Sequence, residues 1–569
     1  MKKLTYILLT LMTIGIFSSC DLEKMPYEEM SDQVALSTEE GLYNATLGNY
    51  SFLKSEYFVK PFHYIPEFGS DNVALSGSTT DGLFYLYNLQ RNKDNGHLSG
   101  LWGNSFKVII ACNKVIEKAE EGKSSEMDNL IGENYYLRAF LYFTMVNAFG
   151  RPYAQDNGES LGVPLKTTSD PDEFPIRSKV SEVYAQIEAD LLKAETLLKS
   201  EKNSCYASKE VAQALLSRVY LYMEDHAKCI EYSDKVINSG RYSLIQDKDY
   251  AEYPVHLPED NNETIFALRH LTDTDLPDGN PSWGQWRPYL TVGAMYSHID
   301  GMGWGEMYAS SSLREVMNQY PQDLRHAFIE PQFIEGDNGK IRTVQWTEEF
   351  YDENQQHERY RYVVKEVQEE EVDGTMKYYF EEEGTKTYVE EEIAGDITRN
   401  YVMLGGEKQY AELTYKMKSR NGYPKYYVVK CSRQEGETQN WSPVVSRLAE
   451  MYLNRAESYA KQNNSAKALE NINVIRERAQ IPAYTEVPEG RTILDVVLQE
   501  RRVELAYEGH RKFDVFRNKL TLNRRYPGTH DLGSATAVRL EVPYTANEVR
   551  CYIPQREIDA YPVELQQNP

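Results

Sequence analysis

The chain has 569 residues, with 62 Lys or Arg against 87 Asp or Glu, so its formal net charge is -25. This length exceeds what one compact core usually holds, and we expect more than one packed unit. A surface this acidic repels phosphate backbones, which argues against nucleic acid as a partner and favours a neutral or cationic ligand. The six cysteines form no CxxC pair and no regular framework, so neither a structural zinc site nor a disulfide scaffold is expected.

The first residues predict a secreted protein. Lys2 and Lys3 precede an apolar run over 4–17, which is too short to span a bilayer and is typical of a signal peptide. Small residues at 18 and 19 then lead into Cys20, in the pattern of a bacterial lipobox. We therefore predict a signal peptide over 1–19, lipidation of Cys20 and a polar tether over 20–36. The alternative is an ordinary signal peptide followed by a chance cysteine.

Helical periodicity marks two separate stretches of the chain. In VSRLAEMYLNRAESYAKQNNSAKALENINVIRERAQIP, small and larger apolar residues recur at the spacing of a tetratricopeptide helix pair: Ala456, Tyr459, Ala468, Ile472 and Ile475. An earlier stretch repeats this spacing with Ser217, Tyr220, Cys229, Ser233 and Val236. The repetition predicts a helical scaffold whose units stack on each other.

The helical rhythm stops near residue 253, and residues 341–435 alternate in the manner of strands. Asp373 and Gly374 lie between two alternating segments and predict a tight hairpin turn. The glutamate runs at 369–371 and 381–383 indicate a solvated sheet face.

The densest aromatic stretch has neither helical nor strand periodicity and is rich in glycine. It contains Trp283, Trp286, Tyr289, Tyr296, Trp304 and Tyr308, with Gln285, Arg287 and Asp300 as polar neighbours. Either the rings plug a cleft between the helices and the middle region, or two or three of them stand exposed as a stacking platform. Flat aromatic rings cover the apolar face of a pyranose, while amide, carboxylate and guanidinium groups hydrogen-bond its hydroxyl rim.

Four segments resemble the SusD/RagB family of outer-membrane lipoproteins of Bacteroidota. They are 102–116 (WGNSFKVIIACNKVI), 133–152, 211–244 and 445–518, the last with RLAEMYLNRAESYAK and ERRVELAYEGHRKFDVFRN. The resemblance implies a mainly α, SusD-like fold with tetratricopeptide-type hairpins and an inserted loop-rich region with short β-hairpins. It divides the mature chain into a helical part over 37–254, an inserted ligand-binding region over 255–435 and a closing part over 436–569.

The same resemblance implies a non-catalytic protein that binds a glycan and delivers it to a SusC-like TonB-dependent transporter. It favours the exposed aromatic platform of Trp283, Trp286, Tyr289, Tyr296 and Trp304, with Arg287 beside it. It adds Asp71 and Asn72, from a loop rich in small polar residues, as glycan contacts. Trp102, at the start of a helix, either packs inside or protrudes toward the ligand.

Three further expectations follow from the resemblance. Asp323 and Arg325 match a family segment and are interpreted as a structural ion pair. Acidic residues at 21 and 23 resemble an export signal, so an outer-membrane, cell-surface location is expected for the lipid-anchored chain. No metal site or cofactor is predicted, although some relatives carry calcium.

Two other functions stay open. A glycoside hydrolase needs two carboxylates at a set separation, and 87 acidic residues offer many pairs. The chain has no GxSxG, HExxH or GxxxxGK[ST] motif, and no GxGxxG that opens a helix after a strand. The second alternative is a tetratricopeptide scaffold that holds an extended peptide. A lipid anchor and three tryptophans in one glycine-rich segment favour a glycan over a peptide.

Overall fold

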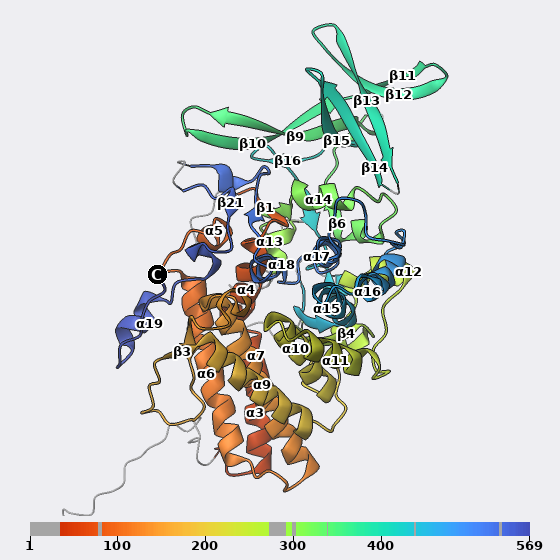
Figure 1. Ribbon diagram of the computed structural model, residues 1–569. Coiled ribbons are helices and arrows are strands. Elements are labelled where there is room, and N and C mark those ends of the chain that lie inside the picture. The colour runs from red at the N-terminus through yellow and green to blue at the C-terminus, as the bar shows by residue number, and fades with distance from the viewer. Residues whose placement is uncertain are drawn as a thin grey trace, which may run out of the picture.

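The computed structural model describes residues 35–77, 82–271, 292–298, 303–337, 339–395, 397–436, 440–533 and 537–569. Long helices form one end of the molecule, a seven-stranded sheet forms the other, and short helices and strands lie between them (Figure 1). The predicted mainly α architecture with β-hairpins in the middle of the sequence is therefore confirmed. Over the described ranges, every helix is too short or too polar to cross a membrane.

The helical end contains α3 (Glu39–Leu53), α6 (Gly96–Lys118), α7 (Ser125–Phe149) and α9 (Val180–Leu197), which run alongside one another (Figure 1). Helix α7 is apolar around most of its circumference because neighbouring helices cover it on several sides. A buried ion pair fastens α7 to α9, with Arg138 Nη2 lying 2.6 Å from Asp190 Oδ1. This end is a rigid base for the rest of the fold.

The two predicted tetratricopeptide-type pairs are α10 (Lys209–Tyr222) with α11 (His226–Ile237), and α15 (Leu448–Lys461) with α16 (Ser465–Arg478). The small residues lie where the helices cross: the Oγ atoms of Ser217 and Ser233 are 2.8 Å apart. Asn454 Nδ2 donates to Ser217 Oγ at 3.1 Å, which joins the second pair to the first. The predicted stacking of the two units is confirmed.

Short elements connect the helical end to the sheet. They include α4 (Glu56–His63), the π-helical turn η1 (Tyr64–Phe68), α5 (Gly82–Tyr87), α12 (Asp247–Ala251), α13 (Gly293–Tyr296), α14 (Ser311–Met317), α17 (Ile493–Glu504), α18 (Arg511–Arg517) and α19 (Gln555–Ala560). Three two-stranded sheets tie distant segments together: β1 (Val73–Leu75) with β5 (Met307–Ala309), β4 (Thr264–Ala267) with β19 (Val444–Arg447), and β6 (Ile329–Pro331) with β18 (Tyr426–Val428). A fourth joins the consecutive strands β2 (Leu161–Pro164) and β3 (Arg177–Lys179).

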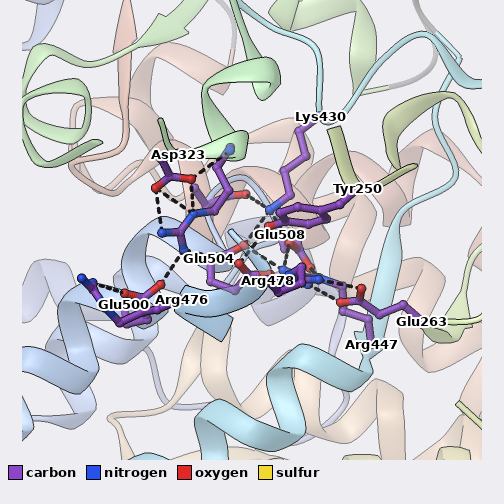
Figure 2. Close-up of polar contacts among 12 residues, drawn as sticks. Tyr250, Glu263, Asp323, Lys430, Arg447, Arg476, Arg478, Glu500, Glu504 and Glu508 are labelled. Carbon is purple, nitrogen blue, oxygen red and sulfur yellow. Dashed lines mark hydrogen bonds and ion pairs between the residues drawn. The ribbon is translucent and has the colours of Figure 1, made fainter. Parts of the chain in front are cut away.

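A buried ionic cluster holds the closing helices to the middle of the chain (Figure 2). Arg447 Nη1 lies 2.7 Å from Glu263 Oε1 and 2.6 Å from Glu504 Oε1. Arg325 Nη2 lies 2.8 Å from Asp323 Oδ2, which confirms the predicted ion pair. Buried charges persist only when each has a partner, so the members of this cluster depend on one another.

The large sheet is antiparallel throughout and has the order β10-β9-β15-β14-β13-β12-β11. Its strands are β9 (Arg342–Asp352), β10 (His357–Glu366), β11 (Gln368–Val372), β12 (Thr375–Glu382), β13 (Thr385–Ala394), β14 (Ile397–Leu404) and β15 (Glu407–Tyr415). Asp373 and Gly374 form the predicted turn, with φ of 51° and 78°, which suits a two-residue hairpin. The glutamates at 369, 371 and 381–383 are exposed, as expected, while Glu370 is half-buried.

Candidate functional site

Of the two platform residues that the structure describes, Tyr296 and Trp304, the second lies at the surface. Its side chain is 46% exposed. The backbone is held in place, since its N–H donates to the carbonyl oxygen of Ala294 at 2.7 Å. Arg420, in β16 (Ser419–Arg420), donates from Nη1 to the Trp304 carbonyl oxygen at 2.9 Å. A half-exposed indole on an anchored backbone is suited to contact a ligand without reorganisation.

Polar groups from distant segments lie around the backbone of Trp304. Arg420 Nη2 also donates to Glu306 Oε1 at 2.9 Å. Its guanidinium therefore contacts both the Trp304 carbonyl oxygen and the Glu306 carboxylate. Asn421, next along the chain, donates from Nδ2 to the carbonyl oxygen of Ser76 at 2.9 Å. An aromatic face beside guanidinium, carboxylate and amide groups matches the two surfaces of a sugar ring.

The turn that carries Trp304 requires glycine after it. Gly305 has a φ of 51°, in the left-handed region. A Cβ atom at this position would lie 2.8 Å from the Cβ atom of His298, closer than side chains pack. The glycines of this segment therefore include one whose backbone conformation and close packing exclude a side chain.

Two of the predicted aromatic contacts are corrected because their rings are buried. Tyr296 is fully buried, its hydroxyl 2.7 Å from His63 Nε2 and its ring edge-on to Phe68 and Tyr507. Trp102 is 3% exposed and packs against Phe106 and Phe149, with ring centroids 5.1 Å away in both cases. Both rings fill the core, and neither has a face for a ligand. Of the two alternatives predicted for Trp102, packing inside the protein is therefore the one that the structure shows.

Asp71 and Asn72 are also corrected, because both side chains are used inside the protein. Arg511 Nε lies 2.7 Å from Asp71 Oδ1, and Arg502 Nη2 lies 3.3 Å from Asp71 Oδ2. Asn72 Nδ2 donates to Glu67 Oε1 at 3.0 Å, and its Oδ1 accepts from Arg502 Nε at 3.0 Å. The two residues brace β1 against α17 and α18.

The electrostatics of this brace agree with a structural role. Burial alone would raise the pKa of the Asp71 carboxyl, but the guanidiniums of Arg502 and Arg511 outweigh it and hold that pKa well below its usual range. The carboxylate therefore stays ionised and paired at any physiological pH.

The remaining predicted positions lie outside the described residues. They are Cys20, Trp283, Trp286, Arg287 and Tyr289. Their assignments stay predictions. Within the part of the chain that the structure describes, no group of three or more His, Cys, Asp or Glu side chains is arranged to hold a metal ion.

Sequence reasoning missed the polar neighbours of Trp304. Arg420 lies 116 residues after it, in a short hairpin with no pattern that links it to Trp304. The available signal was weak: Asn421-Gly422, a dipeptide typical of two-residue turns, marks where this hairpin returns.

Comparison with known proteins places the chain in a family. Residues 262–569, more than half of the chain, match the family model described as "SusD family". The chain belongs to the SusD family. A second match covers residues 22–221 and is described as "Starch-binding associating with outer membrane". The resemblance seen in the sequence is therefore confirmed.

Relatives within the SusD family align along most of the chain. SusD-like protein P2 of Formosa agariphila is 26% identical over 91% of this chain and 90% of its own. The starch-binding protein SusD of Bacteroides thetaiotaomicron is 22% identical over 74% of this chain and 69% of its own. The crystal structure of a SusD superfamily protein from Bacteroides thetaiotaomicron covers 93% of this chain and 99% of its own, with 24% identity and a TM-score of 0.69, and shows that the fold is shared.

Proposed function

We propose that this protein is a non-catalytic, glycan-binding lipoprotein of the outer membrane. The observation that carries the proposal is the half-exposed Trp304 ring beside Arg420 and Glu306, in a chain of the SusD family. Trp304 covers the apolar face of a sugar, and the groups around it bind the hydroxyl rim. Trp283, Trp286, Tyr289 and Arg287, predicted from the sequence as glycan contacts, remain part of the proposal.

The descriptions of related proteins support this ligand class. One family match is described as starch-binding and as associating with the outer membrane, and one relative is a starch-binding protein. A net charge of -25 favours a neutral ligand over an acidic polysaccharide. We therefore infer a neutral oligosaccharide or polysaccharide.

We further propose that the protein hands its ligand to a SusC-like TonB-dependent transporter. Cys20, once lipidated, holds the chain on the outer membrane facing outward, and the rigid helical end docks on the transporter. A modest affinity, about -8 to -4 kcal/mol, suits capture followed by release.

A glycan array probed with the chain lacking residues 1–20 tests the proposal. Binding to one or a few neutral glycans is the expected result. A reducing-sugar assay on each bound glycan should stay at the buffer level, because the protein binds without cleaving. Release of sugar would establish a glycoside hydrolase instead. Binding to a peptide array and to no glycan would establish the peptide scaffold.

A further inference from the structure

The seven-stranded sheet carries an unusual row of tyrosines on one face. Antiparallel partners share a face and side chains alternate along each strand, so the pairing register assigns every residue to a side. The pairs Thr347–Tyr362, Gln345–Glu412 and Tyr401–Tyr410 connect one face across four strands. This face, which we call the tyrosine face, carries Tyr351, Tyr360, Tyr362, Tyr379, Tyr388, Tyr401 and Tyr410.

These tyrosines do not form the core of the sheet. The opposite face holds the buried apolar cluster, in which Trp346 and Phe380 stack with ring centroids 5.9 Å apart. On the tyrosine face, Tyr351 is 64% exposed and Tyr410 is 36% exposed. Tyr379, on the same side, is 8% exposed. Tyr379 is thus the buried exception, and the exposed rings of Tyr351 and Tyr410, which fill no core, indicate a recognition surface.

Several charges on this face are paired with a charge of opposite sign. Lys377 Nζ lies 3.0 Å from Glu390 Oε2, and Lys408 Nζ lies 2.6 Å from Glu392 Oε1. The tyrosine hydroxyls join these pairs, since Tyr410 Oη donates to Glu392 Oε2 at 2.7 Å. These pairs reduce the net field across the neighbouring rings. The surface therefore suits a neutral, hydroxyl-bearing ligand better than a polyanion or a strongly charged protein.

A cavity of about 500 Å³ lies between the sheet and α14, with Tyr362 and Tyr410 in its lining. This volume is within the range of small-ligand sites, roughly 300–1,000 Å³. Arg314 of α14 forms one wall, fixed by an ion pair with Glu412 and by the ring of Tyr426, whose centroid lies 3.5 Å away. The Nε atoms of Arg314 and Arg399 are buried without a hydrogen-bond partner among the described residues.

We propose that this cavity and the tyrosine face form a second carbohydrate site, distinct from the surface around Trp304. The cavity takes one end of a neutral oligosaccharide, whose hydroxyls meet Arg314 and Arg399. The following sugar rings lie on the tyrosines. Tyr410 on β15 lies level with Glu390 on β13, and Tyr388 lies two residues further along that strand. Because strands are about 4.8 Å apart and rise about 3.4 Å per residue, the two tyrosines are separated by roughly 12 Å, enough for a chain of sugars to cross both. The ligand class rests on the proposed function, whereas the location rests on the sheet register and the cavity.

Isothermal titration of the full-length protein, purified in detergent, tests this site. The probes are maltohexaose, cellohexaose, xylohexaose and mannohexaose. The test variant carries Tyr362→Ala and Tyr410→Ala, and the matched control carries Tyr43→Ala, an aromatic residue on α3 that is 48% exposed. We expect the double variant to bind the preferred hexasaccharide at least fivefold more weakly than wild type, and Tyr43→Ala to leave the affinity unchanged. Tyr410→Phe should retain binding, because the stacking ring is kept.

A Trp304→Ala background separates the two sites. Residual hexasaccharide binding should survive in Trp304→Ala and disappear when the two tyrosine changes are added. If wild type binds and the tyrosine changes never alter affinity or stoichiometry, the second site is wrong. If wild type binds none of the probes and no neutral glycan on the array, the proposed function fails for neutral glycans and this site fails with it. If the double variant binds sugar normally but no longer co-purifies with a membrane transporter, the face is a protein-docking surface and the proposal is overturned.

Discussion

The Nε atom of Arg511 lies 2.7 Å from Oδ1 of Asp71, which joins two residues 440 positions apart in the chain. The loop around Asp71 and Asn72, predicted from the sequence to contact the ligand, is thus part of the interior. Asp71 and Asn72 hold β1, the strand that pairs with β5 just beyond Trp304, against the closing helices. The candidate surface depends on this brace without including it.

Replacing Asp71 with Ala should therefore destabilise the protein. The change leaves the guanidiniums of Arg502 and Arg511 buried without their carboxylate, at a cost of about 3 kcal/mol. Urea denaturation followed by circular dichroism measures the loss. The exposed Asp172→Ala is the control and should be close to neutral. A stable Asp71→Ala protein with weakened glycan binding would contradict this structural role and show that Asp71 contributes to the ligand site.

The ionic cluster predicts sensitivity to acid. Burial alone would raise the pKa of the Glu508 carboxyl, but Arg447 and Lys430 outweigh it and lower the pKa to about 2 from an ordinary 4.5. A depressed pKa stabilises the fold above the unfolded-state value and loses this effect as the pH falls toward the folded-state value. Between pH 5 and pH 3, Glu508 should lose about 2 kcal/mol of its contribution to the free energy of unfolding.

Urea unfolding curves recorded at pH 7, 5 and 3 measure how the free energy of unfolding changes with pH. Glu508→Gln should be less stable than wild type at pH 7. Its free energy of unfolding should fall less on acidification, because residue 508 then has no carboxyl to protonate. Equal pH slopes in the two proteins would contradict the role given to Glu508.

The two tryptophans Trp102 and Trp304 predict opposite mutational phenotypes. Trp102→Ala removes a core ring between Phe106 and Phe149 and should lower the free energy of unfolding by about 3–5 kcal/mol. Glycan affinity of the folded fraction should not change. Thermal denaturation and titration of the same sample separate the two effects. A Trp102→Ala protein that is stable but fails to bind would place this ring in the ligand site.

If Cys20 carries the lipid anchor, replacing this residue should release the protein from the membrane. Cys20→Ala should abolish incorporation of labelled palmitate and move the protein from the membrane to the soluble fraction, because the acyl chains supply about 0.8 kcal/mol per buried CH₂. Cys205→Ala, which removes a half-buried free thiol, is the matched control. Persistence of label in Cys20→Ala would show that the lipid is attached elsewhere.

Local patterns in the sequence were sufficient for the scaffold. The small residues at Ser217 and Ala456 are required where two helices cross, and the Asp373-Gly374 turn requires left-handed backbone at both positions. These constraints act over a few residues, so periodicity and turn chemistry reveal them. The Asp323–Arg325 pair is equally local.

The candidate site depends on contacts that no local pattern contains. Trp102 and Trp304 both lie beside glycines, yet one is buried by Phe149 and the other is half exposed, because tertiary packing decides burial. The tyrosine face likewise results from tertiary structure. Tyrosines alternate along single strands, but the strand order decides that Tyr362, Tyr401 and Tyr410 share one face.

The affinity of Trp304→Ala for the glycan found on the array tests the central claim most directly. The account predicts a protein as stable as wild type that binds about five- to tenfold more weakly, since one exposed stacking ring contributes about 1 kcal/mol. Tyr43→Ala, a similarly exposed aromatic residue on the helical end, should bind as wild type does. Unchanged affinity in Trp304→Ala would contradict the claim that this indole contacts the sugar.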